Sequence, residues 1–484
     1  MVRAGKAELA LGSRHGGPSL VAMDTHDLLA AAATHAATYL DDVDTRPVAA
    51  SVDHAELRER LGGPLPAHPS DAHGVLDELV AAVEPGLVHS AGGRFFGFVV
   101  GGALPVSVAA DWMTAAWDQN AGIYVLSPAG AVVEEVAGDW ARDLLGLPPG
   151  VSVGFTTGDT MANLVGLAAA RSRVLELAGW DVGRQGLFGA PPIEVVVGAQ
   201  RHVSIGASLR YLGLGSERVH VVPVDTQGRM RADALGTVLR ELAGRPLIVC
   251  AQAGEVNTGA FDPVGEICDI AHAHDAWVHV DGAFGLWAAA APSLRHLTDG
   301  VERADSWATD AHKWLNVPYD SGLAFVADPA AHRAATSLLT ADYLVRDEVR
   351  RDASDWVPEL SRRARGFSVW AALRQLGRAG VAELVERCCA HARRFAEQLG
   401  AAGRVEILND VVLNQVLVRF LADDGDHDGH TREVIARVQS DGTCWMGGTS
   451  WQGKAAMRIS VSNWSTTTED VDRSVAAVLR AAGR

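Results

Sequence analysis

The chain has 484 residues, which exceeds one typical domain of roughly 100–200 residues and suffices for a large core with a smaller appended domain. Hydrophobic residues make up 48% and charged residues 21% of the sequence, and this composition excludes an intrinsically disordered chain. The formal net charge of −17 has the wrong sign for attraction to nucleic acid or to an anionic membrane surface. We therefore expect a small-molecule substrate, with neither nucleic acid nor membrane as a partner.

No run of the sequence approaches the roughly 18 consecutive apolar residues that a membrane span requires, and the start lacks a secretory pattern. The eighteen histidines include no HExxH motif, and the five cysteines lack the paired spacing of metal sites. We expect a cytoplasmic protein without a metal centre and with reduced cysteines. These cysteines are Cys250, Cys268, Cys388, Cys389 and Cys444.

Residues 1–22 are rich in glycine and small polar residues, and two interpretations stay open for them. Either they form a disordered leader, or Met23 is the true start of the chain. From 23 to 147 apolar residues recur at helical spacing, for example over 28–40 and 75–83, and this predicts a helical N-terminal region.

The pattern changes between 148 and 355, where short runs rich in valine and isoleucine alternate with helical segments. Such alternation predicts an α/β domain with a mostly parallel sheet covered by helices on both faces. Ligands of such sheets bind outside the carboxyl ends of the strands. The expected strands are 151–155, 193–197, 219–224, 247–251, 277–280 and 322–326.

Residues 356–484 predict a smaller α+β domain. A long helical run follows Ser361, strand-like pieces lie at 412–420 and 457–461, and a final helix begins near 468–470.

The most informative segment reads WVHVDGAFGLW from Trp277 and continues to DAHKW at Trp314. A strand ending at Asp281 places a carboxylate at the ligand edge of the sheet, and Lys313 follows another short strand about thirty residues later. A pyridine aldehyde cofactor needs these two groups, because the lysine amine forms an imine and the carboxylate keeps the ring nitrogen protonated. The apolar neighbours Trp314 and Leu315 favour desolvation, so we expect a lowered pKa for Lys313.

The HVDGAFG segment beginning at His279 and the HKW segment resemble those of the group II pyridoxal-phosphate decarboxylases, the family of aromatic amino-acid and glutamate decarboxylases. The similarity runs from about Val75 to near the C-terminus. It implies a fold-type-I, aspartate aminotransferase-like enzyme with pyridoxal 5′-phosphate as cofactor. By this resemblance Asp281 is the partner of the ring nitrogen, Lys313 is the Schiff-base lysine, Ala283 lies against the ring and His312 lies beside the phosphate.

Upstream, GFTTGDTMANLVGLAAAR (154–171) reads as a strand, a turn and a helix, whose first N–H groups form a phosphate site. The pattern alone is weak, but the corresponding family segment cradles the cofactor phosphate. Gly158, Asp159 and Thr160 are therefore the expected contacts. The resemblance also makes His202 the histidine that stacks on the cofactor ring.

Two further residues take roles from the resemblance. Tyr343 matches a loop tyrosine that helps to protonate the carbon left by CO2 loss, often in the neighbouring subunit. Arg458 matches an arginine of the small domain that meets a substrate carboxylate. The pair Arg362 and Arg363 also matches a family position, and we expect a structural or surface role for it.

The sequence departs from the family pattern around the substrate. Glu255 and Val256 replace a Thr-Thr pair, and the glycine-rich stretch 97–102, which contains Phe98, replaces a Phe-Pro-Thr stretch. The segment DQNAGIY looks closer to the glutamate decarboxylase version. We expect a more polar pocket for a polar or small side chain, with Phe98, Asn120, Tyr124 and Arg458 as substrate contacts.

The sequence thus predicts α-decarboxylation of an L-amino acid to an amine and CO2, in a homodimer with its active site at the subunit interface. A carbon–carbon lyase, an aldolase-like enzyme or an oxidative aldehyde synthase on the same scaffold is the alternative. A non-catalytic relative is disfavoured because Lys313, Asp281 and His202 are all present.

Overall fold

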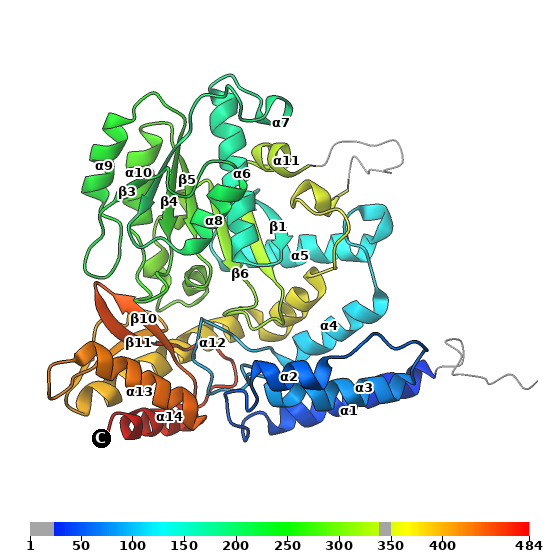
Figure 1. The fold of residues 1–484 in the computed structure, drawn as a ribbon. Helices are drawn as coiled ribbons and strands as arrows, with labels where there is room; N and C mark the ends of the chain where they lie inside the picture. Colours follow the sequence, from blue (N-terminus) through cyan, green and yellow to red (C-terminus); the bar gives the residue numbers. More distant parts are fainter. Residues whose placement is uncertain (1–23, 338–349, 484) are drawn as a thin grey trace, which may run out of the picture. The chain divides into compact units, whose positions relative to one another are not determined.

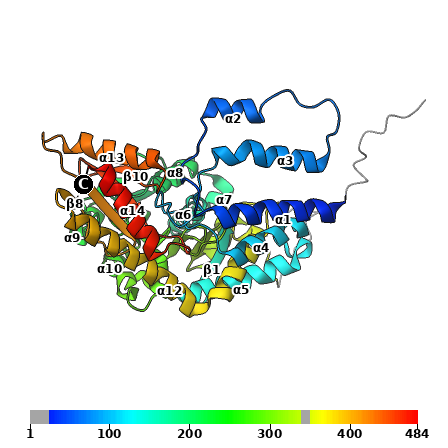
Figure 2. The same cartoon turned by 90° about the horizontal axis from the view of Figure 1, so that it is seen from below.

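The computed structural model describes residues 24–337 and 350–483, and the chain divides into two compact units, 1–89 and 90–484. The described part of the first unit consists mainly of helices (Figure 2), which confirms the helices expected at 28–40 and 75–83. Each helix begins after an aspartate whose carboxylate accepts N–H groups of the first turn, which stabilises the helix end. The helices are α1 (Thr25–Asp42), α2 (His54–Leu61) and α3 (Ala72–Val83), followed by a short turn η1 (Glu84–Gly86).

The second unit contains a seven-stranded sheet in the order β1-β7-β6-β5-β4-β2-β3 (Figure 1). The pairs from β6 to β3 are parallel, whereas β7 runs antiparallel to both of its neighbours. The strands are β1 (Ser152–Thr156), β2 (Glu194–Gly198), β3 (His220–Val222), β4 (Leu247–Gln252), β5 (Trp277–Asp281), β6 (Ser306–Asp310) and β7 (Gly322–Val326).

Helices cover both faces of this sheet. Alternate residues of strand β4 point to opposite faces, and each set packs against a different pair of helices. Ile248 and Cys250 of β4 pack in one cluster with α6 (Asp159–Leu177) and α8 (Val203–Tyr211). Val249 and Ala251 pack in another with α9 (Ala232–Glu241) and α10 (Val264–His272). A strand buried on both faces needs a continuous apolar run, which explains the valine-rich segments of the sequence. The helices of this part are α4 (Pro105–Trp117), α5 (Pro128–Leu144), α6 (Asp159–Leu177), α7 (Val182–Gln185), α8 (Val203–Tyr211), α9 (Ala232–Glu241), α10 (Val264–His272) and α11 (Pro329–Thr336).

The C-terminal part of this unit carries a four-stranded antiparallel sheet in the order β10-β11-β9-β8. The strands are β8 (Val405–Ile407), β9 (Gln415–Phe420), β10 (Gly447–Trp451) and β11 (Lys454–Ser460), and the helices are α12 (Gly366–Ala401), α13 (His427–Asp441) and α14 (Thr468–Ala481). Helix α12 changes direction at Gly377, whose φ of 59° is left-handed and suits glycine. Helix α14 begins with a capping box between Thr467 and Asp470.

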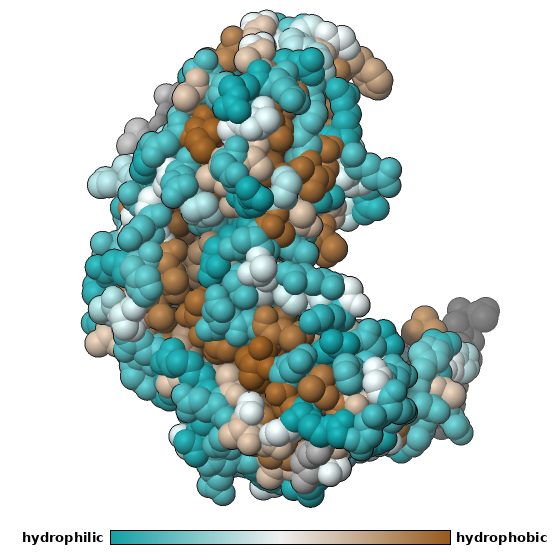
Figure 3. All heavy atoms as spheres, turned by 90° about the vertical axis from the view of Figure 1, so that its left-hand side faces the viewer, coloured by the Kyte–Doolittle hydropathy of each residue, from teal (hydrophilic) through white to brown (hydrophobic). Residues whose placement is uncertain are grey.

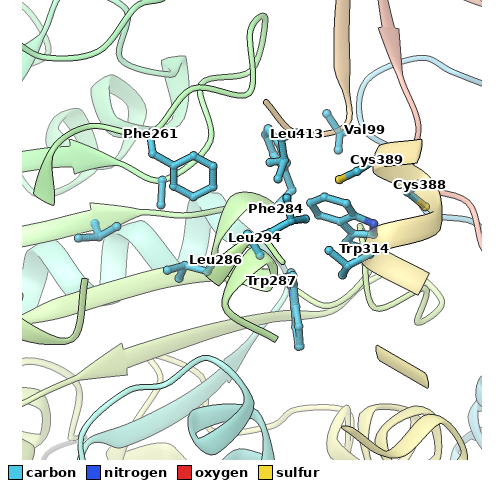
Figure 4. Close-up of a cluster of buried hydrophobic side chains, with 14 of the residues drawn as sticks. Val99, Phe261, Phe284, Leu286, Trp287, Leu294, Trp314, Cys388, Cys389 and Leu413 are labelled. Atoms are coloured by element: carbon cyan, nitrogen blue, oxygen red, sulfur yellow. The ribbon is translucent and has the colours of Figure 1, made fainter. Parts of the chain in front are cut away.

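A buried apolar cluster lies close to the expected lysine (Figure 4). The indole of Trp314 is 1% exposed and lies 6.4 Å from the ring of Phe284, with Cys388 and Cys389 of α12 beside it. Burying an indole removes a large apolar area from water. The residue directly after Lys313 is thereby anchored in the core.

The predicted α/β architecture with a mostly parallel central sheet is confirmed. All six expected strands are present, and β9, β11 and α14 occur where the sequence predicts them. The domain boundaries at 147 and 355 stay predictions, and the leader 1–22 lies outside the described residues. The five cysteines are buried and unbridged. Across the described ranges, no helix has both the length and the apolar character that crossing a bilayer requires.

Gly166 of α6 provides a test of the packing beneath the site. A Cβ atom there would lie 2.6 Å from Cε1 of His279, a ring that neighbouring bonds hold in place. We expect Gly166→Ala to lower the free energy of unfolding by about 1–3 kcal/mol, measured by urea denaturation, because overpacking outweighs the better helix propensity of alanine.

The matched control is Gly236 in α9, where a Cβ would meet nothing closer than 3.7 Å. There Gly236→Ala should stabilise the protein by up to about 1 kcal/mol. Equal effects at the two positions would show that the ring of His279 is not a rigid neighbour.

Candidate active site

The carboxyl edge of the large sheet collects the ionisable residues that the sequence predicts. Asp281 ends β5, Asp310 ends β6, and the turn before α6 follows β1. Because the parallel strands end at the same edge, residues distant in sequence meet there. The three carboxyl groups of Asp159, Asp281 and Asp310 are no more than 6% exposed.

Lys313 lies at this edge, with Nζ 3.0 Å from Oδ2 of Asp310. Its side chain is 19% exposed. The sequence contains only two other lysines, Lys6 and Lys454. Glycine is required opposite Lys313, because a Cβ at Gly101 would lie 1.6 Å from the Lys313 carbonyl oxygen.

The lowered pKa expected for Lys313 is wrong for the protein alone. Burial does lower the pKa of the ammonium, but the carboxylates of Asp310, Asp159 and Asp281 outweigh that effect, and the net pKa is raised. Asp310 stands only three residues before Lys313 in the sequence, but the expectation considered the apolar neighbours alone. Asp159 and Asp281 approach from other elements of the fold.

The carboxylate of Asp281 is held by three donors. Oδ2 lies 3.3 Å from Nδ2 of Asn163 and 3.3 Å from Oγ of Ser204, and Oδ1 accepts the N–H of Ala283 at 3.4 Å. These bonds fix the carboxylate without a cation, so it is able to pair with a protonated ring nitrogen.

A buried chain of hydrogen bonds orients Asn163. Its Oδ1 lies 2.8 Å from Nε2 of His279, whose Nδ1 lies 2.8 Å from Oγ of Ser306. Burial lowers the pKa of His279 to about 4, so the ring is neutral and donates from Nε2 to the amide oxygen. The amide nitrogen of Asn163 must therefore face the carboxylates of Asp159 and Asp281.

The turn before α6 has the features of a phosphate cradle. Thr160 is exposed in the first helical turn, and the N-terminal end of a helix favours a bound phosphate. The N–H of Met161 in this turn already donates to the carbonyl of Gly158 at 3.0 Å. His312 borders the turn, since a Cβ at Gly158 would lie 3.1 Å from its Cε1. The backbone N–H of Asp159 donates to Oδ1 of Asp310 at 2.6 Å, which ties the turn to β6.

His202 is the N-cap residue of α8, at the end of the segment that follows β2. Its N–H donates to Oε1 of Gln252, and its Nδ1 lies 2.8 Å from Oγ of Ser204. Burial lowers the pKa of the imidazole, so the ring is neutral near pH 7 and suited to stacking on an aromatic cofactor.

Arg458 of β11 acts electrostatically on both His202 and Glu255. Glu255 is 2% exposed and accepts hydrogen bonds from the backbone N–H groups of Asn257 and Thr258. It also accepts from the side-chain amide of Asn257. The carboxylate that replaces the family's hydroxyl thus stabilises its own loop.

The structure gives Asn120 and Tyr124 partners that the sequence does not predict. Oδ1 of Asn120 accepts the N–H groups of Gly122 and Arg362, so the amide joins two chain segments. The N–H of Tyr124 donates to Asp352, and Arg350 lies over its ring. Whether either residue contacts the substrate stays a prediction.

Phe98 has a positive φ of 54°, is 62% exposed and stacks on Trp445 at 5.2 Å. Trp445 also stacks on Phe95 at 5.1 Å. Phe95, Phe98 and Trp445 therefore form an aromatic stack. Its two phenylalanines belong to the same segment as Gly101, which contacts the backbone of Lys313. Neither this stacking nor the participation of Trp445 is predicted from the sequence.

Arg362 has a structural role, as expected. It is buried and ion-paired with Glu134 at 2.5 Å, and it donates to the carbonyl of Phe155 in β1. Arg363 pairs with Asp111 at the surface. Tyr343 lies outside the described residues.

The site residues fit pyridoxal phosphate. Lys313 offers a largely buried amine, Asp281 offers a carboxylate with no ion pair among the described residues, and the turn at Gly158 offers a helix N-terminus beside His312. The fold and these residues together define the class of enzymes that use pyridoxal phosphate.

Comparisons with known proteins identify the family. The protein-family model described as "Pyridoxal-dependent decarboxylase conserved domain" matches residues 55–421 of this chain. The chain belongs to this family, the group II pyridoxal-phosphate-dependent amino-acid decarboxylases.

Tryptophan decarboxylase 1 of Oryza sativa subsp. japonica is 28% identical over 92% of this chain and 91% of its own length. Phenylacetaldehyde synthase of Petunia hybrida is 26% identical over 88% of this chain and 87% of its own. A crystal structure of Oryza sativa TDC with PLP and tryptamine has a TM-score of 0.89 and 25% identity, covering 97% of this chain and 99% of that one.

The role of Lys313 can be tested chemically. Borohydride treatment of the cofactor-loaded protein, followed by peptide mass spectrometry, should place the reduced cofactor on Lys313, because within residues 24–337 and 350–483 it is the lysine that lies beside the site carboxylates. Lys313→Ala should lose this adduct and all turnover. Lys454→Ala, at an exposed position in β11, should keep both. A reduced adduct on another lysine would refute the assignment.

Proposed function

We propose that the protein removes the α-carboxyl group of an L-amino acid as CO2 and releases the amine. The observation that carries this proposal is the meeting of Lys313, Asp281 and the Gly158 turn at one sheet edge, in a chain of the decarboxylase family.

Each residue has a defined task in this reaction. Bound pyridoxal phosphate supplies an electron sink for the electron pair left at the α-carbon. Lys313 holds the cofactor, Asp281 keeps a proton at the ring-nitrogen end, and His202 covers the ring. Arg458 attracts a carboxylate toward this side of the site, since a guanidinium binds carboxylates in bidentate geometry. Tyr343 donates the proton that replaces CO2.

An aromatic side chain is the better-supported substrate. The polar or small side chain expected from the sequence depends partly on Asn120, whose amide oxygen is occupied by backbone N–H groups. The exposed ring of Phe98, held against Trp445, offers a flat apolar surface instead. The rice relative is named for tryptophan.

A panel of L-amino acids separates these substrates. We expect CO2 release to be highest with tryptophan, tyrosine or phenylalanine, and Phe98→Ala should raise the KM for the aromatic substrate by roughly tenfold, which corresponds to about 1.4 kcal/mol. Selective turnover of glutamate or another acidic amino acid would instead support the polar pocket.

The oxidative aldehyde synthase is the second candidate, because one relative bears that name. Tyr343 distinguishes the two reactions, since a phenol that donates a proton to the α-carbon favours the amine. Tyr343→Phe keeps the aromatic ring and deletes the donor, so amine formation should fall and aldehyde formation under air should rise.

The measurement is the ratio of amine to aldehyde, compared with Tyr211→Phe as a control. Tyr211 is exposed at the end of α8, and removal of its hydroxyl should leave the ratio unchanged. An unaltered rate and ratio in Tyr343→Phe would remove the case for this proton donor.

A homodimer that completes the site is part of the proposal. Exposed aromatic and aliphatic side chains cluster on α4, where Trp112, Met113 and Trp117 are 44–49% exposed. Phe98 and Val203, next to site residues, are 62% and 79% exposed. Apolar side chains also break the polar surface of the face in Figure 3. Burial against a second subunit would remove such side chains from water.

A cytoplasmic location is supported by the five unbridged cysteines, which suit a reducing compartment.

A further inference from the structure

Asp159 is an unusual residue for a phosphate turn, because it adds a negative charge where a phosphate dianion must bind. Its side chain is 6% exposed, and its Oδ1 is buried with no hydrogen-bond partner. A carboxylate oxygen left this way is costly unless it carries a proton or meets a ligand.

Asp159 and Asp281 form a carboxyl pair through Asn163. Nδ2 of Asn163 lies 2.7 Å from Oδ2 of Asp159 and 3.3 Å from Oδ2 of Asp281, so both oxygens crowd one nitrogen. The ring of His279 fixes the direction of that amide. When two carboxyl groups are buried this close together, their negative charges repel each other if both are ionised. The repulsion favours a state in which the pair keeps one proton.

The charges around Asp159 come from the elements packed against α6. Strand β5 contributes Asp281 and the neutral His279, β6 contributes Asp310, and the segment after β6 contributes the ammonium of Lys313. His312 and His202 border the same edge as neutral rings. Three carboxylates then face a single ammonium, and a bound phosphate would add to the excess negative charge.

We propose that Asp159 carries the proton of this carboxyl pair, and that pyridoxal phosphate binds tightly only while Asp159 is protonated. Asp281 is then the ionised member that remains for the ring nitrogen. Loss of the proton places a second buried negative charge beside the phosphate turn, so cofactor binding weakens as the pH rises.

The direction of the Asp159 titration supports the proposal. Burial raises the pKa of this carboxyl well above its ordinary value, the carboxylates of Asp281 and Asp310 raise it further, and Lys313 only partly opposes them. The proposal rests on the identity of the cofactor and not on the reaction proposed above.

The test measures binding without imine formation. The probe is 4′-deoxypyridoxine 5′-phosphate, which has a methyl group in place of the aldehyde, and binding is followed by calorimetry from pH 6 to pH 9. Titration of the phosphate itself is common to all variants and cancels in the comparison.

We expect Asp159→Asn to bind the probe as tightly as the wild type at pH 6 and more tightly at pH 9. Above the pKa of Asp159 the wild-type affinity should fall by up to about tenfold per pH unit, because the carboxylate must first take up a proton. Asp159→Ala keeps the backbone N–H that bonds Asp310, and it should show the same flattened pH dependence. It serves as the second variant if the asparagine protein fails to fold.

The matched control is Asp305→Asn. Burial also raises the pKa of Asp305, but this carboxyl precedes β6 at the opposite edge of the sheet, where it accepts the N–H of Val278. Asp305→Asn should bind the probe with the same pH dependence as the wild type. Identical pH profiles for the wild type and both Asp159 variants, or weaker binding by those variants at every pH, would overturn the proposal.

Thermal unfolding of the cofactor-free protein gives a second readout. A carboxyl group with a raised folded-state pKa keeps a proton that the unfolded chain releases, so the folded state loses stability as the pH rises above the unfolded pKa. The midpoint of Asp159→Asn should therefore exceed that of the wild type at pH 8, and the difference should shrink toward pH 5. A constant difference would contradict a titrating Asp159.

Discussion

The geometry of the site depends on two of the contacts made by the carboxylate of Asp310. One oxygen accepts the backbone N–H that opens α6, and the other lies 3.0 Å from the ammonium of Lys313. A single side chain at the end of β6 therefore fixes the distance between the phosphate turn and the lysine. Because Asp310 is 2% exposed, water does not compete for these bonds, and each is stronger than at the surface.

The carboxylate of Asp281 is also held in place by buried hydrogen bonds. Trp277 donates to Ser306, which lies between it and His279, and the amide of Asn163 carries the chain on to the carboxylates. Ser306, His279 and Asn163 each have partners on both sides, and satisfied polar groups of this kind add rigidity to a buried network. Gly166 leaves room for the imidazole within α6. Small and polar residues of one helix thus determine how a carboxylate on a neighbouring strand is presented.

The sequence is informative about this site wherever the signal is local. Valine-rich runs predict the strands, and the HVDGAFG and HKW segments identify Asp281 and Lys313. Asn163, Ser204 and Asp310 are not predicted. Asn163 and Ser204 bond Asp281, and Asp310 accepts the N–H of Asp159, over separations of 77 or more residues, and only the folded sheet edge brings these partners together. The same reason explains only part of the wrong direction expected for the pKa of Lys313, since Asp159 and Asp281 are distant in the chain whereas Asp310 is three residues away.

The phosphate turn raises an electrostatic question that these contacts answer. Among the described residues, the charges that act most on Asp159 are the ammonium of Lys313 and the carboxylates of Asp281 and Asp310, so cations are not in surplus around this turn. The attraction must come from the helix N-terminus and its N–H groups, which contribute only about half a unit of positive charge. A single ionised carboxylate at the same turn carries one full negative charge, which is enough to cancel the positive charge of the helix N-terminus. The protonation state of Asp159 therefore decides whether the turn attracts or repels the phosphate.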